Sequence, residues 1–101
     1  MSTIFLSGVT FHQDVVEGLH IGQRLYLRRE PQNKFDPNAI RVEDADGLQV
    51  GFIPKETAAQ MAPVIDETGQ YPTAKVSNLT EFRIKGQGFT GVEIFLGLPE
   101  S

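Results

Sequence analysis

The sequence has 101 residues and contains no cysteine. Disulfide bonds, thiolate metal sites and cysteine nucleophiles are therefore excluded, and the composition fits a reducing compartment. The longest apolar runs are a handful of residues, too short to span a membrane. Because no cationic stretch leads into an apolar segment at the N-terminus, we expect no secretory signal. The default expectation is a cytoplasmic protein, associated with the nucleoid if it binds DNA.

Patterns that indicate catalysis are also missing. Ser7 and Thr10 are hydroxyl residues near His12, but their spacing does not suggest a catalytic triad. No pair of carboxylates stands out as a general acid and a general base. We therefore predict a protein that is not an enzyme and that has no small-molecule substrate.

Metal and cofactor sites have little support. His12, Asp14 and His20 could be combined into a metal site, but two histidines eight residues apart across a glycine form a weak pattern. The stretch Gly86-Gln87-Gly88 is too short for a phosphate-binding loop and lacks a following helix. A flexible hairpin explains these glycines better. We expect neither a metal ion nor a cofactor.

Length and composition indicate one globular domain over residues 1–101. The chain is 40% hydrophobic and 22% charged, which fits a folded protein with one modest core. Its net charge is −4, which opposes attraction of the whole surface to nucleic acid. The residues between Arg24 and Lys34 nevertheless carry a local excess of cations, as a small anion site would require.

Hydrophobic patterning predicts six strands and one convincing helix. The expected strands are Thr3–Phe11, Gln23–Arg29, Ala39–Glu43, Leu48–Ile53, Tyr71–Phe82 and Gly91–Gly97. His12–Gly22 should be a turn with at most one helical turn, and Arg83–Gly88 a glycine-rich connector. The helix is expected over Lys55–Glu67, where Pro63 should kink or divide it.

Alternation within these segments assigns side chains to the core and to the surface. Leu25 and Leu27 should point inward, while Arg24, Tyr26 and Arg28 point outward. The other core candidates are Ile40, Val42, Ala58, Met61, Ala62, Ile65, Ala74, Val76, Leu79, Val92, Ile94 and Leu96. Short strands with internal glycines favour a curved sheet that closes to remove its edges. We therefore predict a mainly β fold with one or two short helices: a small, closed or partly open six-stranded barrel of the OB or SH3 type, with the helix capping one end.

The stretch from Arg28 to Ile40 has the densest mixture of side-chain chemistry in the chain. Pro31 and Pro37 stiffen it, and its asparagines and aspartate can bond neighbouring amides. It presents an aromatic ring, a carboxylate, an amide and three cations: Phe35, Asp36, Asn33, Arg28, Arg29 and Lys34. Phe35 could be a stacking platform or a lid over the end of the barrel. Phe11, Tyr26 and Phe95 are further candidate platforms, because single-stranded nucleic acid binds to aromatic rings and cations on small barrels.

This stretch carries a resemblance to a known family. The pattern R-E-P-x-N-x-[FY]-D-x-N-A-I, followed by an acidic hairpin with glycine and by the segment Val50–Lys55, is similar to the HIRAN domain. The resemblance runs from about Val9 to Asp66. It implies a modified oligonucleotide-binding barrel, known as a module of fork-remodelling helicases and as small free-standing proteins. The best-studied members bind the 3′ end of single-stranded DNA.

The resemblance implies roles for matched residues. Phe35 would stack on the terminal base, Asp36 would accept a hydrogen bond from the 3′-hydroxyl, and Asn33 would position base or backbone. Lys55 would meet a phosphate. Together with the aromatic and cationic candidates, the predicted nucleic-acid site is Phe11, Arg28, Arg29, Asn33, Lys34, Phe35, Asp36 and Lys55.

The chain departs from the DNA-binding members at three positions. Phe11 stands where they have a tyrosine, Thr10 where they have an arginine, and Phe52 where they have a histidine. A hydroxyl contact and a phosphate partner are lost, although a stack on Phe11 could remain. The alternative hypothesis is therefore a module on the same barrel that binds a protein or peptide partner and no nucleic acid.

Overall fold

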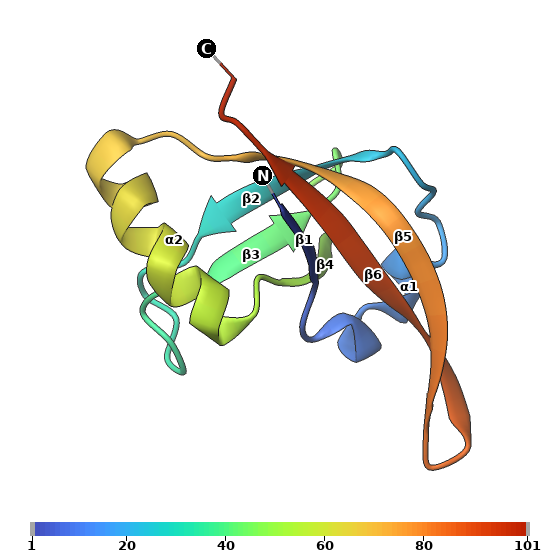
Figure 1. Cartoon of the computed structure of the whole chain (residues 1–101). Helices are drawn as coiled ribbons and strands as arrows, with labels where there is room; N and C mark the ends of the chain where they lie inside the picture. Colours follow the sequence, from blue (N-terminus) through green and yellow to red (C-terminus); the bar gives the residue numbers. More distant parts are fainter. Residues whose placement is uncertain (1, 101) are drawn as a thin grey trace.

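The computed structural model of the chain describes residues 2–100. Six antiparallel strands form one sheet in the order β1-β6-β5-β2-β3-β4 (Figure 1). The strands are β1 (Ser2–Phe5), β2 (Arg24–Arg29), β3 (Ile40–Glu43), β4 (Gln49–Phe52), β5 (Thr73–Ile84) and β6 (Gln87–Gly97). Two α-helices, α1 (Gln13–Val16) and α2 (Lys55–Thr68), and one 3₁₀ helix, η1 (Val9–Phe11), complete the fold. The predicted mainly β class with short helices is confirmed.

The sheet curves into a partly open barrel. Its two end strands, β1 and β4, are not paired with each other as strands. Just after β1, however, Ser7 forms an isolated bridge with Phe52 of β4. The backbone amide of each residue donates to the carbonyl of the other at 2.9 Å. This single bridge links the two ends of the sheet.

The barrel encloses one hydrophobic core, and the alternation predicted along β2 is observed. Leu25 and Leu27 are buried, whereas Arg24, Tyr26 and Arg28 are exposed. Met61 and Leu79, both predicted for the core, are only partly buried and pack against it. The remaining predicted core residues are buried: Ile40, Val42, Ala58, Ala62, Ile65, Ala74, Val76, Val92, Ile94 and Leu96.

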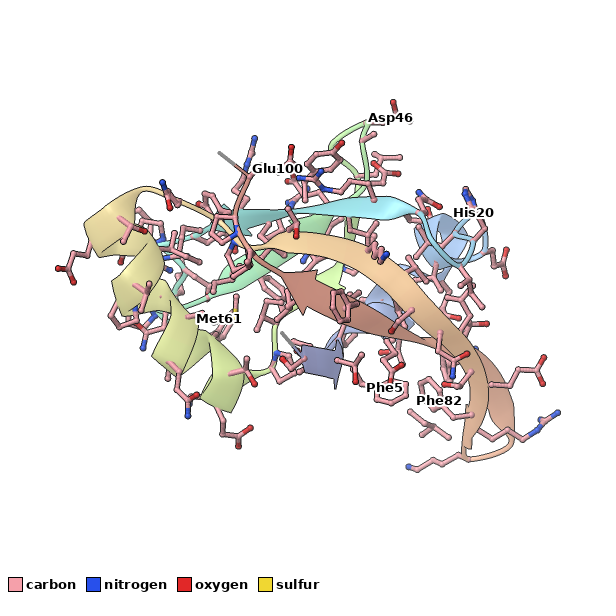
Figure 2. All side chains as sticks on the ribbon, turned by 45° about the horizontal axis from the view of Figure 1, so that its top comes forward. Phe5, His20, Asp46, Met61, Phe82 and Glu100 are labelled. Carbon is pink, nitrogen blue, oxygen red and sulfur yellow. The ribbon has the colours of Figure 1, made fainter. Side chains whose placement is uncertain are left out.

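Helix α2 lies at one end of the barrel, with Ala58, Ala62 and Ile65 facing the core (Figure 1). Met61 lies on the side of the helix that faces the sheet (Figure 2). Pro63 does not divide the helix, which continues to Thr68 before Gly69 ends it at φ 70°. The helix is neither long nor apolar enough to cross a membrane, and the same is true of α1.

The predicted N-terminal strand Thr3–Phe11 was wrong in its second half. Strand β1 ends at Phe5 rather than continuing to Phe11. Gly8 adopts φ 74°, which a β-branched residue would resist, and the chain turns there into η1. The predicted single helical turn between His12 and Gly22 is present as α1.

The predicted connector Arg83–Gly88 was also wrong, because most of it is strand. After one register shift between Val76 and Asn78, β5 and β6 pair regularly up to Ile84 and Gln87, leaving a two-residue turn of Lys85 and Gly86. Both turn residues have positive φ, 50° and 84°, as tight hairpins of matching twist require. The hairpin projects away from α2, at the far end of the molecule (Figure 1).

Candidate functional site

The loop between β2 and β3 is closed by its own backbone. The Glu30 amide donates to the Ala39 carbonyl at 3.0 Å, which carries the strand pairing one step past the end of β2. Within the loop, the Asn33 amide donates to the Glu30 carbonyl and the Ala39 amide to the Asp36 carbonyl, both at 3.0 Å. These bonds give the loop a defined shape and fix the direction in which residues 33–36 point.

Asn33 organises the tip of this loop. Its side-chain oxygen accepts from the amides of Phe35 at 2.9 Å and Asp36 at 3.1 Å. Its Nδ2 group donates to a carboxylate oxygen of Glu30 at 3.0 Å. The Asn33 oxygen is thus already in use, but the NH₂ group has a second hydrogen that can reach a ligand.

A pocket of about 330 Å³ opens between this loop and the start of α2. It is lined by Ser7, Asn33, Phe35, Asp36, Ala39, Phe52, Ile53 and Lys55. Four of the eight predicted site residues therefore meet in one place: Asn33, Phe35, Asp36 and Lys55. Lys55 reaches it because Pro54, which ends the extended segment after β4, also precedes the first turn of α2.

Phe35 is not a lid over the end of the barrel. Its side chain is 93% exposed, so the ring makes almost no contact with the protein. Burying such a ring would stabilise the fold by about 1.5–3 kcal/mol, and here the loop holds it in solvent instead. The ring is available to stack on a planar ligand above the pocket.

Asp36 uses one carboxylate oxygen for the loop and leaves the other open. Oδ1 accepts from the Asn38 amide at 2.9 Å. Oδ2 has no hydrogen-bond partner among residues 2–100. A carboxylate oxygen at the wall of a pocket attracts a hydroxyl group and repels a phosphate. Lys55 lies across the same pocket and forms no ion pair with the described part of the chain.

Arg29 has a different place from the one expected. Its side chain is only 9% exposed, and both Nε and Nη2 donate to the carboxylate of Asp66 in α2 at 2.9 Å. Nη1 donates to the carbonyl of Ala39 at 2.9 Å, and the Arg29 amide donates to the hydroxyl of Tyr71. Arg29 thus ties the loop to α2 instead of lining the pocket, and we assign it a structural role.

Replacing Asp66 by Asn tests this tie. The hydrogen bond from Arg29 lowers the pKa of Asp66 from its ordinary 3.8, and the same bond raises the pKa of Arg29. A carboxylate with a lowered folded-state pKa adds stability above pH 4, and this stability is lost as the pH falls through the folded-state pKa. We expect Asp66→Asn to lower the urea midpoint at pH 7, and we expect its difference from the wild type to shrink as the pH falls below about 4. Equal midpoints at pH 7 would contradict the assignment.

The other predicted site residues do not line the pocket. Lys34 is exposed at the loop tip, and Phe11 is 83% exposed at the end of η1. Arg28 lies on the outer side of β2, with its side chain 68% exposed and Nε 3.8 Å from Glu43. Tyr26 and Phe95 each lie under a cation, Arg24 at 4.9 Å and Lys75 at 5.8 Å from the ring centroid.

The pocket wall includes residues that the sequence did not single out. Ser7 and Ala39 have no chemistry that would mark them, and Ile53 is an ordinary apolar strand-end residue. Gly51 did give an indication, because a glycine inside a strand suggests a close backbone approach. An ideal Cβ at Gly51 would lie 2.6 Å from the Ser7 carbonyl oxygen, so this glycine allows Ser7 to reach the pocket.

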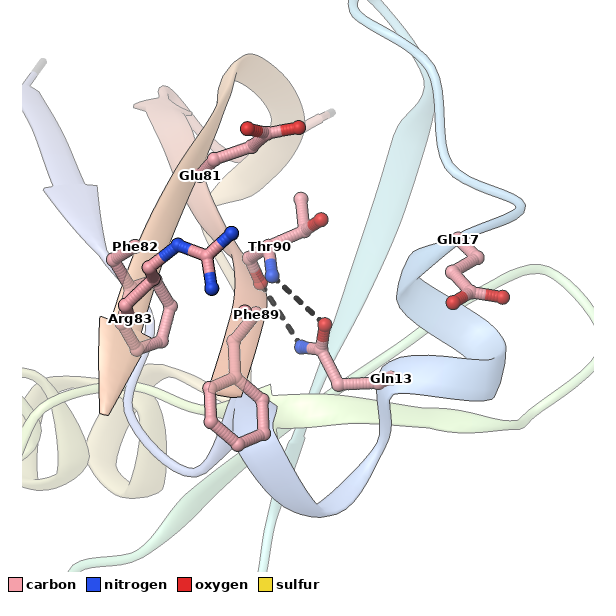
Figure 3. A pocket seen from close by; sticks show the side chains of 8 residues that line it. Gln13, Glu17, Glu81, Phe82, Arg83, Phe89 and Thr90 are labelled. Atoms are coloured by element: carbon pink, nitrogen blue, oxygen red, sulfur yellow. Dashed lines mark hydrogen bonds between the residues drawn. The ribbon is translucent and has the colours of Figure 1, made fainter. Parts of the chain in front are cut away.

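A second pocket lies on the opposite part of the barrel, between α1 and the β5–β6 hairpin (Figure 3). There the side-chain amide of Gln13 pairs with the backbone of Thr90. Its Nε2 donates to the Thr90 carbonyl at 3.0 Å, and its Oε1 accepts from the Thr90 amide at 2.8 Å. Gln13 therefore extends the sheet beyond the end of β1.

The weak metal pattern of His12, Asp14 and His20 does not form a site, since no group of three metal-binding side chains meets within residues 2–100.

Known proteins resemble this chain in sequence and in fold. The sequence model of the HIRAN domain matches residues 1–87. Helicase-like transcription factor from Oryctolagus cuniculus is 39% identical over 59 residues, which are 58% of this chain and 6% of that protein. The Fanconi-associated nuclease 1 homolog from Arabidopsis thaliana is 38% identical over 52 residues, which are 52% of this chain and 6% of that protein. The chain thus spans a small fraction of the length of these relatives.

A solved structure shares the fold over nearly the whole chain. The crystal structure of the HIRAN domain of human HLTF superimposes with a TM-score of 0.66 at 24% sequence identity. The match covers 96% of this chain and 75% of the human chain. It agrees with a small six-stranded barrel that carries a helix at one end.

Proposed function

The chain belongs to the HIRAN domain family, and we propose that it is a non-catalytic module that binds the 3′-hydroxyl end of single-stranded DNA. The relatives reported above are named as a helicase-like transcription factor and a Fanconi-associated nuclease 1 homolog, and these names support a proposed role in DNA repair or replication-fork processing. Those proteins are far longer than this chain, so only the binding step is proposed for it.

The observation that carries the proposal is the pocket in which Phe35, Asp36 and Lys55 meet. The free ring can stack on a base, and the lysine can pair with a phosphate. The open oxygen of Asp36 can accept from a hydroxyl, whereas continuing backbone would bring a phosphate against it. Such a site selects the end of a DNA strand because it attracts the terminal hydroxyl and also repels the phosphate of a continuing backbone.

The proposal predicts a preference for a free 3′-hydroxyl over a 3′-phosphate of about tenfold or more, since a hydrogen bond to a charged group contributes about 1.5–3 kcal/mol. Fluorescence anisotropy with oligonucleotides labelled at the 5′ end and differing only at the 3′ end measures it. Asp36→Asn should reduce the preference to less than about twofold. The amide oxygen can still accept from Asn38, so the loop keeps its shape.

A second pair of oligonucleotides, labelled on an internal base and differing only in a 5′-hydroxyl or a 5′-phosphate, is the matched control and should bind with equal affinity. Equal affinity for the two 3′ ends would remove Asp36 from its proposed role. If no oligonucleotide binds at low salt, the exposed ring and the pocket would instead serve a protein or peptide partner.

A further inference from the structure

The outer face of the sheet carries cations and aromatic rings that the pocket does not use. By outer face we mean side chains that point away from the core on β2, β3, β5 and β6: Arg24, Tyr26, Arg28, Arg41, Lys75 and Phe95. Tyr26 is 43% exposed, and the side chains of Arg24 and Arg28 are 45% and 68% exposed. The face is therefore accessible to a ligand.

Strand register connects this face to the pocket. Ser7 bridges Phe52, Phe52 is opposite Arg41, and Arg41 is opposite Arg28. Directly opposed residues of antiparallel strands project to the same side of a sheet. Because Ser7 and Phe52 line the pocket, this row of four residues begins at the pocket wall and ends at Arg28.

The face continues along β2 with an alternation of charge and ring. Tyr26 and Arg24 follow Arg28 at spacings of two residues and project to the same side. The Arg24 guanidinium lies 4.9 Å from the centre of the Tyr26 ring. On β5, opposite Arg24, the Lys75 ammonium lies 5.8 Å from the centre of the Phe95 ring on β6.

Two carboxylates limit this positive charge, and one of them, Glu43, is shared between Arg41 and Arg28. Glu43 is only 7% exposed, and its carboxylate lies 2.7 Å from Arg41 Nε and 3.8 Å from Arg28 Nε. Glu100, labelled in Figure 2, forms an ion pair with Arg24. The buried carboxylate is held closer to Arg41 than to Arg28, and the exposed side chain of Arg28 remains accessible to a phosphate.

We infer that the outer face binds the part of a single DNA strand that precedes its 3′ nucleotide. This inference rests on the proposed function, because the pocket fixes where the strand ends. From there the backbone crosses β4 and β3 to place a phosphate against Arg28, and a base stacks on Tyr26. Cations that follow a backbone, interleaved with rings for stacking, are what single-stranded nucleic acid requires.

The size of the outer face determines how many nucleotides of single-stranded DNA it can bind. Phe52 on β4 and Arg28 on β2 are two β-strand spacings apart, which is about 10 Å. The four residue steps along β2 from Arg28 to Arg24 add about 13 Å. A dinucleotide held in the pocket has only one step between its nucleotides, which is too short to reach Arg28 or Tyr26. A strand of about eight nucleotides would cover the whole path, within the range of about 4–16 nucleotides that a small barrel binds.

Comparing a dinucleotide with an octanucleotide, both with a free 3′-hydroxyl, tests the inference. Arg28→Ala should weaken octanucleotide binding about tenfold and reduce the slope of log affinity against log salt by about 0.7. Tyr26→Ala should weaken octanucleotide binding by about fivefold or more. Both variants should leave dinucleotide affinity within about twofold of the wild type. Both side chains are exposed, so the fold should be retained, and thermal unfolding checks this.

Lys85→Asn is the matched control: it removes an exposed cation at the hairpin tip, and asparagine tolerates the positive φ there. It should change neither affinity. The inference is overturned if Arg28→Ala has no effect on the octanucleotide, or if it weakens both oligonucleotides equally. A 3′-phosphate on either oligonucleotide reports on the pocket alone, so loss of end preference would count against the proposed function and not against the outer face.

Discussion

Replacing Phe35 by alanine should weaken the binding of single-stranded DNA by about 1–3 kcal/mol and leave the stability of the fold within about 0.5 kcal/mol. The binding loss follows from the stacking surface that disappears. The stability is spared because the ring is 93% exposed and has almost no protein contact to lose. Anisotropy titration measures the first effect, and urea unfolding measures the second.

Ile21→Ala is the matched control for this prediction. Ile21 is also a large exposed apolar residue, 62% exposed, and it does not line the pocket. Its replacement should alter neither binding nor stability. If Phe35→Ala lowered stability by more than 1 kcal/mol and left binding intact, the ring would be a packing element after all, and the proposed site would lose its platform.

The sequence was most informative where local chemistry determines structure. In β2, alternating leucines and polar residues specify which face is buried, and the observed burial follows that pattern. In the loop, the prolines restrict the backbone, and the side-chain oxygens of Asn33 and Asp36 accept from amides two or three residues away, so these residues specify their own turn. Both features depend on neighbours in the chain, so sequence patterns are sufficient to predict them.

The secondary-structure predictions were wrong where contacts between residues far apart in the sequence determine the structure. Thr3–Phe11 has the composition of one long strand, but Gly8 turns the chain so that Ser7 can reach Phe52, 45 residues later. Arg83–Gly88 is rich in glycine and yet forms strand, because Phe82 and Phe89 stack across the hairpin at 5.6 Å. Intrinsic propensity is weak in strands, and cross-strand pairing overrides it.

Arg29 shows the same limit within the candidate site. Its position beside Arg28 in a cationic stretch suggests a phosphate contact, and the residue itself gives no reason to think otherwise. Only the packing of α2 brings Asp66 to it, 37 residues further along the chain. The side chains of the two neighbouring arginines thus point to opposite sides of the sheet: Arg28 projects outward, while Arg29 points toward the loop and the helix.

Gly51→Ala should be the most disruptive small substitution, because Gly51 is the point where the ends of the sheet approach each other. A Cβ there would lie 2.6 Å from the Ser7 carbonyl oxygen and 3.2 Å from a methyl group of Val9. The oxygen belongs to backbone and accepts from the Phe52 amide, so it cannot move away without breaking the bridge. We expect a loss of about 1–3 kcal/mol or more, and a fall in melting temperature of about 4–8 °C for each kcal/mol.

The same substitution should also abolish end-selective binding, because Ser7 and Phe52 form one wall of the pocket. Gly88→Ala is the matched control: nothing lies within 4 Å of its added methyl group, so melting and binding should stay as in the wild type. Thermal unfolding of both variants, followed by titration with 3′-hydroxyl and 3′-phosphate oligonucleotides well below the melting temperature, separates the two effects. A Gly51→Ala protein that melts like the wild type would mean that the bridge does not hold the barrel together. A destabilised variant that still distinguishes the two ends would mean that the pocket is built by the loop and α2 alone.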